Sequence, residues 1–286
     1  LANQFNYAFD TSGSYLISSS FELNSRWSSQ DPLSVQLRFQ TRGIPTDTGY
    51  YSQSLFETDT NVGLVLNYTG SAFTSGSYSG SIPDVDNKYV KLDFYPEPGD
   101  TTNTASVYLP FFNEDWWSAM VTKEGNTYTL YAGNKLYSGS DGSQLGFYAS
   151  SSVTYAGNEW VDSATIEFPS SQGTYGKIFS GSLQEIRYYT TALSESVFKD
   201  YVMNPYSIEG NGINSSPDQL AFRAALGGEL YTSSISIHPK QTGSWQRTAS
   251  FASDSNFYIS SSNFVPNTEY IFFDPNTSRY SKCYFK

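Results

Sequence analysis

Runs that alternate apolar and polar residues recur along this chain, and they restrict it to folds built from strands. The clearest run is 33–39, where Leu, Val, Leu and Phe alternate with Ser, Gln and Arg. Successive side chains of a strand point to opposite faces, so a period of two marks a half-buried strand. Further strands are expected at 15–17, 62–66, 89–94, 106–109, 164–168 and 181–189. The pattern predicts an all-β protein.

Two of the strand-like runs are close enough to form a hairpin. Residues 117–121 and 127–132 both have strand character, and the polar residues 124–126 lie between them with a glycine at the centre. A short Gly-containing connection between two such runs is typical of an antiparallel hairpin.

One segment, 191–203, breaks the strand pattern. Its apolar residues Leu193, Val197, Phe198, Tyr201 and Val202 follow helical spacing. Ser194 or Thr191 can cap the start, and Pro205 ends the helix because the residue before a proline avoids the helical region.

After this helix the composition changes. Residues 209–217 are polar and Gly-rich, which is typical of a linker. We therefore divide the chain into residues 1–205 and a small β unit or appendage, 206–286, with strands expected at 220–223, 234–237 and 270–273. A unit of this size without a disulfide needs support, so we expect it to pack on the first unit or on another subunit. The single cysteine, Cys283, makes an internal disulfide impossible.

Charge excludes two classes of partner. The formal net charge is −11, and the 16 Lys and Arg residues are scattered. Nucleic-acid binding needs a cationic footprint that neutralises phosphates, so we expect no nucleic acid as partner, and anionic membrane surfaces are disfavoured for the same reason. No apolar run approaches the roughly 20 residues of a membrane-spanning helix. Neutral glycans and cationic partners remain compatible with the composition.

The residues of common catalytic centres are sparse. His238 is the only histidine, and it precedes a proline away from any cysteine, so zinc and histidine-based nucleophilic catalysis are disfavoured. Glycosidases on β-sandwiches place carboxylates on alternate residues of one strand. The nearest pairs, Glu159 with Asp162 and Glu114 with Asp115, lack that spacing. The sequence predicts a protein that is not an enzyme and requires no cofactor.

Oxygen ligands for Ca²⁺ are concentrated in one loop. Asp84, Asp86 and Asn87 form the densest group of carboxylate and amide oxygens, the ligand types that Ca²⁺ prefers. These three residues are the candidate metal ligands.

A second short segment combines the groups that bind sugars. Tyr155, Asn158, Glu159 and Trp160 bring aromatic, amide and carboxylate groups together within six residues. An aromatic face takes the C–H surface of a pyranose, and amide or carboxylate groups take its hydroxyls. Tyr50 and Tyr51 are further platforms. The alternative is that these rings simply pack in the core or between subunits, because the chain is 17% aromatic.

Four motifs, in order, resemble those of the LamG-like, concanavalin A-like lectin/glucanase jelly roll, over residues from about 5 to 205. They are the first strand with its turn, the second strand, a central hairpin led by aromatic residues, and a closing strand followed by a short helix. Their positions are 9–17, 31–39, 116–134 and 179–194.

The resemblance implies a jelly-roll sandwich over residues 1–205 with the small C-terminal β appendage. Together, the two parts look like structural or fibre proteins of large viruses and tailed phages. The leading functional expectation is a non-enzymatic virion structural or fibre module that assembles with copies of itself or other surface proteins, with host-surface glycans as candidate ligands. Its location would be the virion surface or the extracellular space. A bacterial cell-surface adhesin or carbohydrate-binding module is one alternative, and a glycoside hydrolase of the same fold is another.

Overall fold

The computed structural model describes residues 32–68, 89–138, 142–160, 166–170, 173–205 and 220–224. It also describes the backbone of six further strands, at 9–10, 18–21, 242–251, 255–263, 269–274 and 279–284. The predicted strands at 15–17 and 234–237 and the predicted linker at 209–217 lie outside these residues. Over the described ranges, no helix has both the length and the apolar character of a membrane span.

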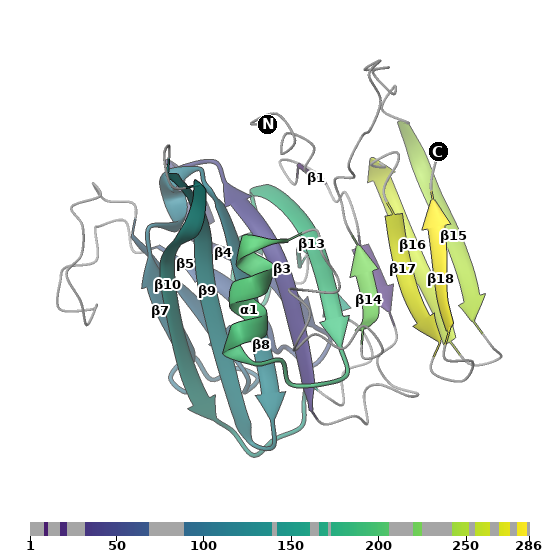
Figure 1. Ribbon diagram of the computed structural model, residues 1–286, viewed down its shortest axis with the longest axis horizontal. Helices are drawn as coiled ribbons and strands as arrows, with labels where there is room; N and C mark the ends of the chain where they lie inside the picture. The colour runs from purple at the N-terminus through teal and green to yellow at the C-terminus, as the bar shows by residue number, and fades with distance from the viewer. Residues whose placement is uncertain are drawn as a thin grey trace.

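The larger sheet has nine strands in the order β10-β9-β8-β3-β13-β14-β17-β18, with β1 paired to β13. All of these pairs are antiparallel. The bounds are β1 (Phe9–Asp10), β3 (Leu33–Thr41), β8 (Trp116–Glu124), β9 (Thr127–Ser138), β10 (Gly142–Thr154), β13 (Gly181–Tyr189), β14 (Leu220–Ala224), β17 (Glu269–Asp274) and β18 (Arg279–Tyr284). In Figure 1, the edge strands β10 and β18 lie on opposite sides of the molecule.

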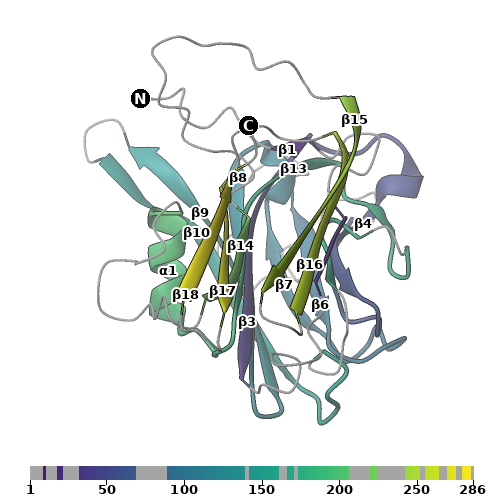
Figure 2. The same cartoon turned by 90° about the vertical axis from the view of Figure 1, so that its right-hand side faces the viewer.

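The second sheet has six strands in the order β11-β4-β5-β6-β7, with the short β12 running parallel to β4. Its strands are β4 (Ser52–Thr58), β5 (Gly63–Asn67), β6 (Val90–Tyr95), β7 (Ala105–Leu109), β11 (Ile166–Glu167) and β12 (Lys177–Ile178). A third sheet joins β2 (Ser18–Phe21), β15 (Thr242–Phe251) and β16 (Ser255–Asn263). Figure 2 shows β15 and β16 from the side on which β14, β17 and β18 lie. Two 3-10 turns, η2 (Thr48–Tyr50) and η4 (Phe111–Asn113), complete the described elements with the helix α1.

The main core lies between the two larger sheets. One face of each strand supplies it, as alternation requires: Val35, Leu37 and Phe39 from β3 meet residues such as Leu64 and Leu92 from the six-stranded sheet. Aromatic rings fill the centre, with Phe94 lying 5.2 Å from Trp160 and 5.8 Å from Tyr128 between ring centroids. The fold is therefore an all-β jelly-roll sandwich, as the sequence predicts.

The helix α1 (Glu195–Met203) covers the outer face of the nine-stranded sheet over β8, β9 and β10 (Figure 1). Phe198 and Tyr201 lie in a second apolar cluster beneath it. Ser194 is the N-cap, since its side chain accepts a hydrogen bond from the Val197 N–H, and Lys135 Nζ donates to the carbonyl of Met203 at 2.8 Å. The predicted helix is confirmed, although it begins at Glu195, after its cap.

The structure contains several strands that the sequence pattern did not predict, among them β4, β10, β12, β15 and β16. Sequence alternation identified β3, β5, β6, β7, the β8–β9 hairpin and β13, but it passed over β4 and β10. Both are rich in small polar residues, and β4 buries Gln53, Ser54 and Glu57 along with its apolar side chains. Because polar residues occupy both faces of these two strands, their sequences do not alternate between apolar and polar residues.

Candidate functional site

A solvent-open groove of about 600 Å³ lies where β4 begins beside β12. One wall comes from η2 and the residues that follow it, and the other from the loop that leads into β12. The lining residues are Thr48, Gly49, Tyr51, Ser52, Gly173, Gly176, Lys177 and Ile178. The Lys177 side chain is exposed and that of Tyr51 is half-buried. The groove therefore offers one aromatic ring, hydroxyls, one cation and the backbone of three glycines.

Gln53, a buried residue of β4, connects both walls. Its amide Nε2 donates to the Tyr50 carbonyl at 2.8 Å, and its Oε1 accepts from the Ser180 N–H at 2.9 Å. The η2 wall is also capped, because Asp47 Oδ1 accepts from the Gly49 N–H at 2.8 Å. Hydrogen bonds of this kind hold a site in one geometry before a ligand arrives.

Glu57, further along β4, anchors the loop 173–176. Its carboxylate accepts a hydrogen bond from the Ser54 hydroxyl and lies 3.4 Å from the backbone N–H groups of Thr174 and Tyr175. Gly176 lets this loop touch the strand: a Cβ at this position would lie 2.4 Å from the Ser52 carbonyl oxygen. The absence of a side chain at Gly176 thus sets the distance between the two walls.

Tyr175 crosses the outer face of the six-stranded sheet from the same loop. Its ring stacks on Tyr95 with 4.5 Å between centroids, and its hydroxyl donates to the Asn61 carbonyl at 2.5 Å. A Cβ at Gly63 would lie 3.0 Å from the Tyr175 ring, so glycine makes room for it. Burial raises the pKa of both Tyr175 and Tyr95 above the usual range, with the Asp93 charge as a further cause at Tyr95.

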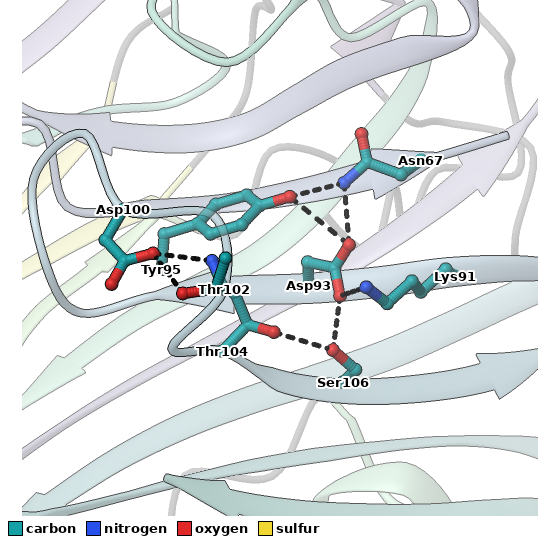
Figure 3. Close-up of polar contacts among 8 residues, drawn as sticks. All are labelled: Asn67, Lys91, Asp93, Tyr95, Asp100, Thr102, Thr104 and Ser106. Atoms are coloured by element: carbon teal, nitrogen blue, oxygen red, sulfur yellow. Dashed lines mark hydrogen bonds and ion pairs between the residues drawn. The ribbon is translucent and has the colours of Figure 1, made fainter. Parts of the chain in front are cut away.

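Asp93 is the centre of a polar cluster on this face (Figure 3). Its Oδ2 accepts from Asn67 Nδ2 at 2.7 Å and from the Tyr95 hydroxyl at 3.3 Å. Its Oδ1 accepts from the Ser106 hydroxyl and lies 2.9 Å from Lys91 Nζ. A buried carboxylate with an ion pair and three hydrogen bonds is fully satisfied, so its role is structural.

The groove and the Asp93 cluster belong to one polar band. Ser52 of the groove pairs with Asn67 on β5, and Asn67 pairs in turn with Lys91 on β6. Because directly paired residues share a face, hydroxyl, amide and ammonium groups continue from the groove across three strands.

The buried carboxylates of the described residues are engaged in holding the fold. Asp93 is paired with Lys91, and Glu57 binds the backbone of the loop 173–176. Glu185 lies 2.8 Å from Arg187 beneath α1, where it is fully buried. None of these groups lines the groove.

The structure separates the four predicted glycan-binding residues. Tyr155 and Glu159 lie together, with the Tyr155 hydroxyl donating to Glu159 Oε1 at 2.8 Å, and this bond raises the pKa of Tyr155 to about 12. Asn158 is exposed. Trp160, however, is 0% exposed and its ring packs on Phe56, Phe94 and Tyr128. Trp160 is therefore a core residue that offers no free ring face, and the glycan prediction at this end rests on the other three residues.

The predicted calcium ligands Asp84, Asp86 and Asn87 lie outside the described residues. Among the residues that the structure describes, no group of three or more His, Cys, Asp or Glu side chains could hold a metal ion. The calcium prediction stays a prediction.

No protein-family model matches this chain, and no curated protein matches it by sequence. Solved structures resemble it in architecture. A candidate carbohydrate-binding protein from Bacteroides ovatus is 10% identical with a TM-score of 0.41, over 91% of this chain and 61% of that one. Tailspike protein 2 of Escherichia coli O157:H7 bacteriophage CAB120 is 16% identical with a TM-score of 0.39, over 66% of this chain and 23% of that one. Domains LG4–5 of the mouse laminin α1 chain are 10% identical with a TM-score of 0.36, over 98% of this chain and 68% of that one.

With TM-scores below 0.5, these similarities carry no argument about what this chain does. The chain spans less than two thirds of the length of the first two proteins. What the whole proteins bind or assemble with is therefore not transferred by the match, and function has to be argued from the groove itself.

Proposed function

We propose that this chain is a non-catalytic saccharide-binding structural module, displayed on a virion surface or in the extracellular space. The observation that carries the proposal is the groove at the start of β4, with walls held by Gln53 and Glu57 and a lining of hydroxyls, glycine backbone, Tyr51 and Lys177. It is open to solvent, which suits a saccharide at the surface better than a small buried metabolite.

The lining has the chemistry that sugars require. Tyr51 supplies an aromatic surface, and its orientation is held by an edge-on contact with Tyr68 at 5.1 Å between centroids. Thr48 and Ser52 supply hydroxyls for the sugar hydroxyls, and the glycines allow close approach to backbone groups. Apolar contact with a few well-placed polar groups is the usual composition of a binding site.

The same lining favours binding over hydrolysis. Glycoside hydrolysis needs two carboxylates on either side of the scissile bond. Among the residues that the structure describes at the groove, none is Asp, Glu or His. The hydrolase alternative is thus the less favoured one, while a bacterial adhesin or carbohydrate-binding module would use the same groove chemistry as a virion fibre.

Two further parts of the proposal concern partners. We expect the module to assemble with copies of itself or with other surface proteins, and to need no cofactor. Asp84, Asp86 and Asn87 stay proposed ligands of a Ca²⁺ ion that the module does not require.

A glycan array tests the proposal. The labelled protein should bind a restricted set of saccharides, and it should do so both in buffer with CaCl₂ and in buffer with EDTA, because no cofactor is required. Saccharides that bind are then incubated with the protein, and mass spectrometry should recover them intact. The absence of any binding, or the release of shorter saccharides, would overturn the proposal.

A further inference from the structure

The edge strand β10 lacks two of the features that keep sheet edges from pairing, charged side chains and prolines. Its 13 residues, Gly142–Thr154, contain no charged residue and no proline. Natural edge strands are usually protected by charged side chains, prolines, bulges or short length, because their outer backbone N–H and C=O groups are ready to pair with another strand. The opposite edge of the same sheet, β18, carries Arg279 and Lys282.

Most of β10 is also regular. A bulge interrupts its pairing with β9 between Leu145 and Tyr148, but from Tyr148 to Thr154 every residue has its partner in register. A strand keeps a straight hydrogen-bonding edge where its register is unbroken. The segment 148–154 therefore offers a regular edge to a partner strand, except at its end, where the Thr154 carbonyl accepts a hydrogen bond from Asn103 Nδ2 at 3.5 Å.

The side chains of this edge are incompletely covered. Phe147, Ala149 and Val153 pack on the main core, yet each is only half-buried. On the opposite face, Ser150, Ser152 and Thr154 are exposed. A neighbouring strand would cover the apolar side chains. On the other face it would meet these small hydroxyl residues and, at one end of the segment, Tyr148, whose ring packs against Phe198 and Lys199 of α1.

We propose that β10 pairs antiparallel with β10 of a second copy of this chain, so that two nine-stranded sheets form one continuous sheet. A two-fold axis through the segment 148–154 matches each strand with one of the same length, and such isologous contacts are the commonest in homodimers. Each copy carries a net charge of −11, which opposes most contacts between copies. The uncharged β10 edge is a place where two copies can meet without opposing charges on the paired strands.

This inference rests on the self-assembly part of the proposed function and is independent of saccharide binding. Size-exclusion chromatography with light scattering, over a dilution series of the full chain, should show a concentration-dependent dimer. Ser152→Lys should lower the association constant by about tenfold or more, because each strand then brings a cation to the paired edge. Lysine lowers the net negative charge of each copy, so weaker association could not be ascribed to greater overall repulsion.

Two control variants isolate the effect. Ser152→Ala removes the same hydroxyl, which lies 2.9 Å from the Thr129 hydroxyl, without adding a charge. Thr46→Lys adds the same charge at an exposed loop position. Both should dimerise like the unaltered chain, and circular dichroism should show all three variants folded.

The outcomes separate the two proposals. A chain that stays monomeric at every concentration would overturn self-assembly and the β10 pairing together. A dimer that Ser152→Lys leaves intact would overturn the β10 pairing alone. Neither result bears on saccharide binding, which the array measures separately.

Discussion

At the scale of single residues, the site depends on buried polar side chains of the six-stranded sheet. Gln53 and Glu57 reach from β4 to backbone groups of both groove walls, and Asp93 links three strands of the same sheet. A buried polar group that loses its partner costs about 1–3 kcal/mol, so these contacts are specific as well as stabilising.

Tyr95 provides a test of the outer-face cluster through pH. Its pKa is raised in the folded protein, first by burial and then by the Asp93 charge, whereas an unfolded tyrosine titrates near pH 10. The folded state then holds the proton more tightly, so this contribution to stability is complete below pH 10 and is lost as the pH rises above it.

Tyr95→Phe should remove that contribution. Between pH 9 and pH 11, urea unfolding of the unaltered chain should lose about 1 kcal/mol more than the variant, after allowance for solvent screening. The other tyrosines are common to both proteins and cancel in the difference. Parallel pH curves for the two proteins would contradict the described environment of Tyr95.

The sequence predicts the strands of this fold better than it predicts the residues of the site. β3, β13 and the hairpin β8–β9 follow from alternation, since one face of each is apolar. Gln53 and Glu57 carry no such signal in the sequence. Gln53 binds the backbone of Ser180 and Glu57 binds the backbone of Thr174, and both partners are more than 100 residues away in the chain. Trp160 is the opposite case. Its position beside Asn158 and Glu159 in the sequence suggests a binding platform, yet a large ring next to polar residues can equally be buried in the core, as it is here.

At the scale of elements, β4 and the loop 173–178 determine the groove. β4 supplies one wall with Ser52 and holds the other through Glu57, while β12 pairs with it in parallel. The loop and β4 approach each other closely at Gly176, so their relative position is most sensitive to a substitution at this residue.

Gly176→Ala should displace the loop from β4, because the new Cβ would lie 2.4 Å from the Ser52 carbonyl oxygen and 2.6 Å from its carbon. We expect a loss of about 1–3 kcal/mol in the free energy of unfolding, together with weaker binding of any saccharide found on the array. Calorimetry of unfolding and of binding gives the two quantities.

Gly125→Ala is the matched control. Gly125 has a φ of +56° in the β8–β9 turn, and an alanine Cβ there would have no neighbouring atom within 4 Å. Alanine at this position therefore costs about 1 kcal/mol of backbone strain away from the groove. It should lower stability and leave binding unchanged. Equal effects of both substitutions on binding would show that the loop position is unimportant.

At the scale of the whole molecule, the nine-stranded sheet runs across the predicted division at residue 205. β14 pairs with β13 from Ile186 to Tyr189, and Leu220 joins the apolar cluster under α1. β17 and β18 extend the same sheet beyond β14 (Figure 1). The division into 1–205 and 206–286 stays a prediction, and the second part contributes strands to the sheet of the first.

Truncation after Pro205 tests how far the first part is independent. Removal of β14 would leave the β13 edge unpaired along Ile186–Tyr189 and expose the apolar cluster that Leu220 covers. We expect a lower unfolding temperature by several degrees and a tendency to aggregate, measured by calorimetry and light scattering. An unchanged unfolding temperature in a monodisperse fragment would instead support a self-sufficient domain over 1–205.

Two tyrosine variants distinguish saccharide binding at the groove beside β4 from binding elsewhere on the protein. Tyr51 lines the groove, whereas Tyr155 lies with Glu159 in the other candidate segment, and both rings are half-buried. Titration calorimetry with a saccharide found on the array should show that Tyr51→Leu weakens binding about fivefold or more, since it removes a ring contact of about 1 kcal/mol. Tyr155→Leu should bind like the unaltered chain. Weaker binding by Tyr155→Leu with unchanged binding by Tyr51→Leu would contradict binding at the groove and would assign the site to Tyr155, Asn158 and Glu159.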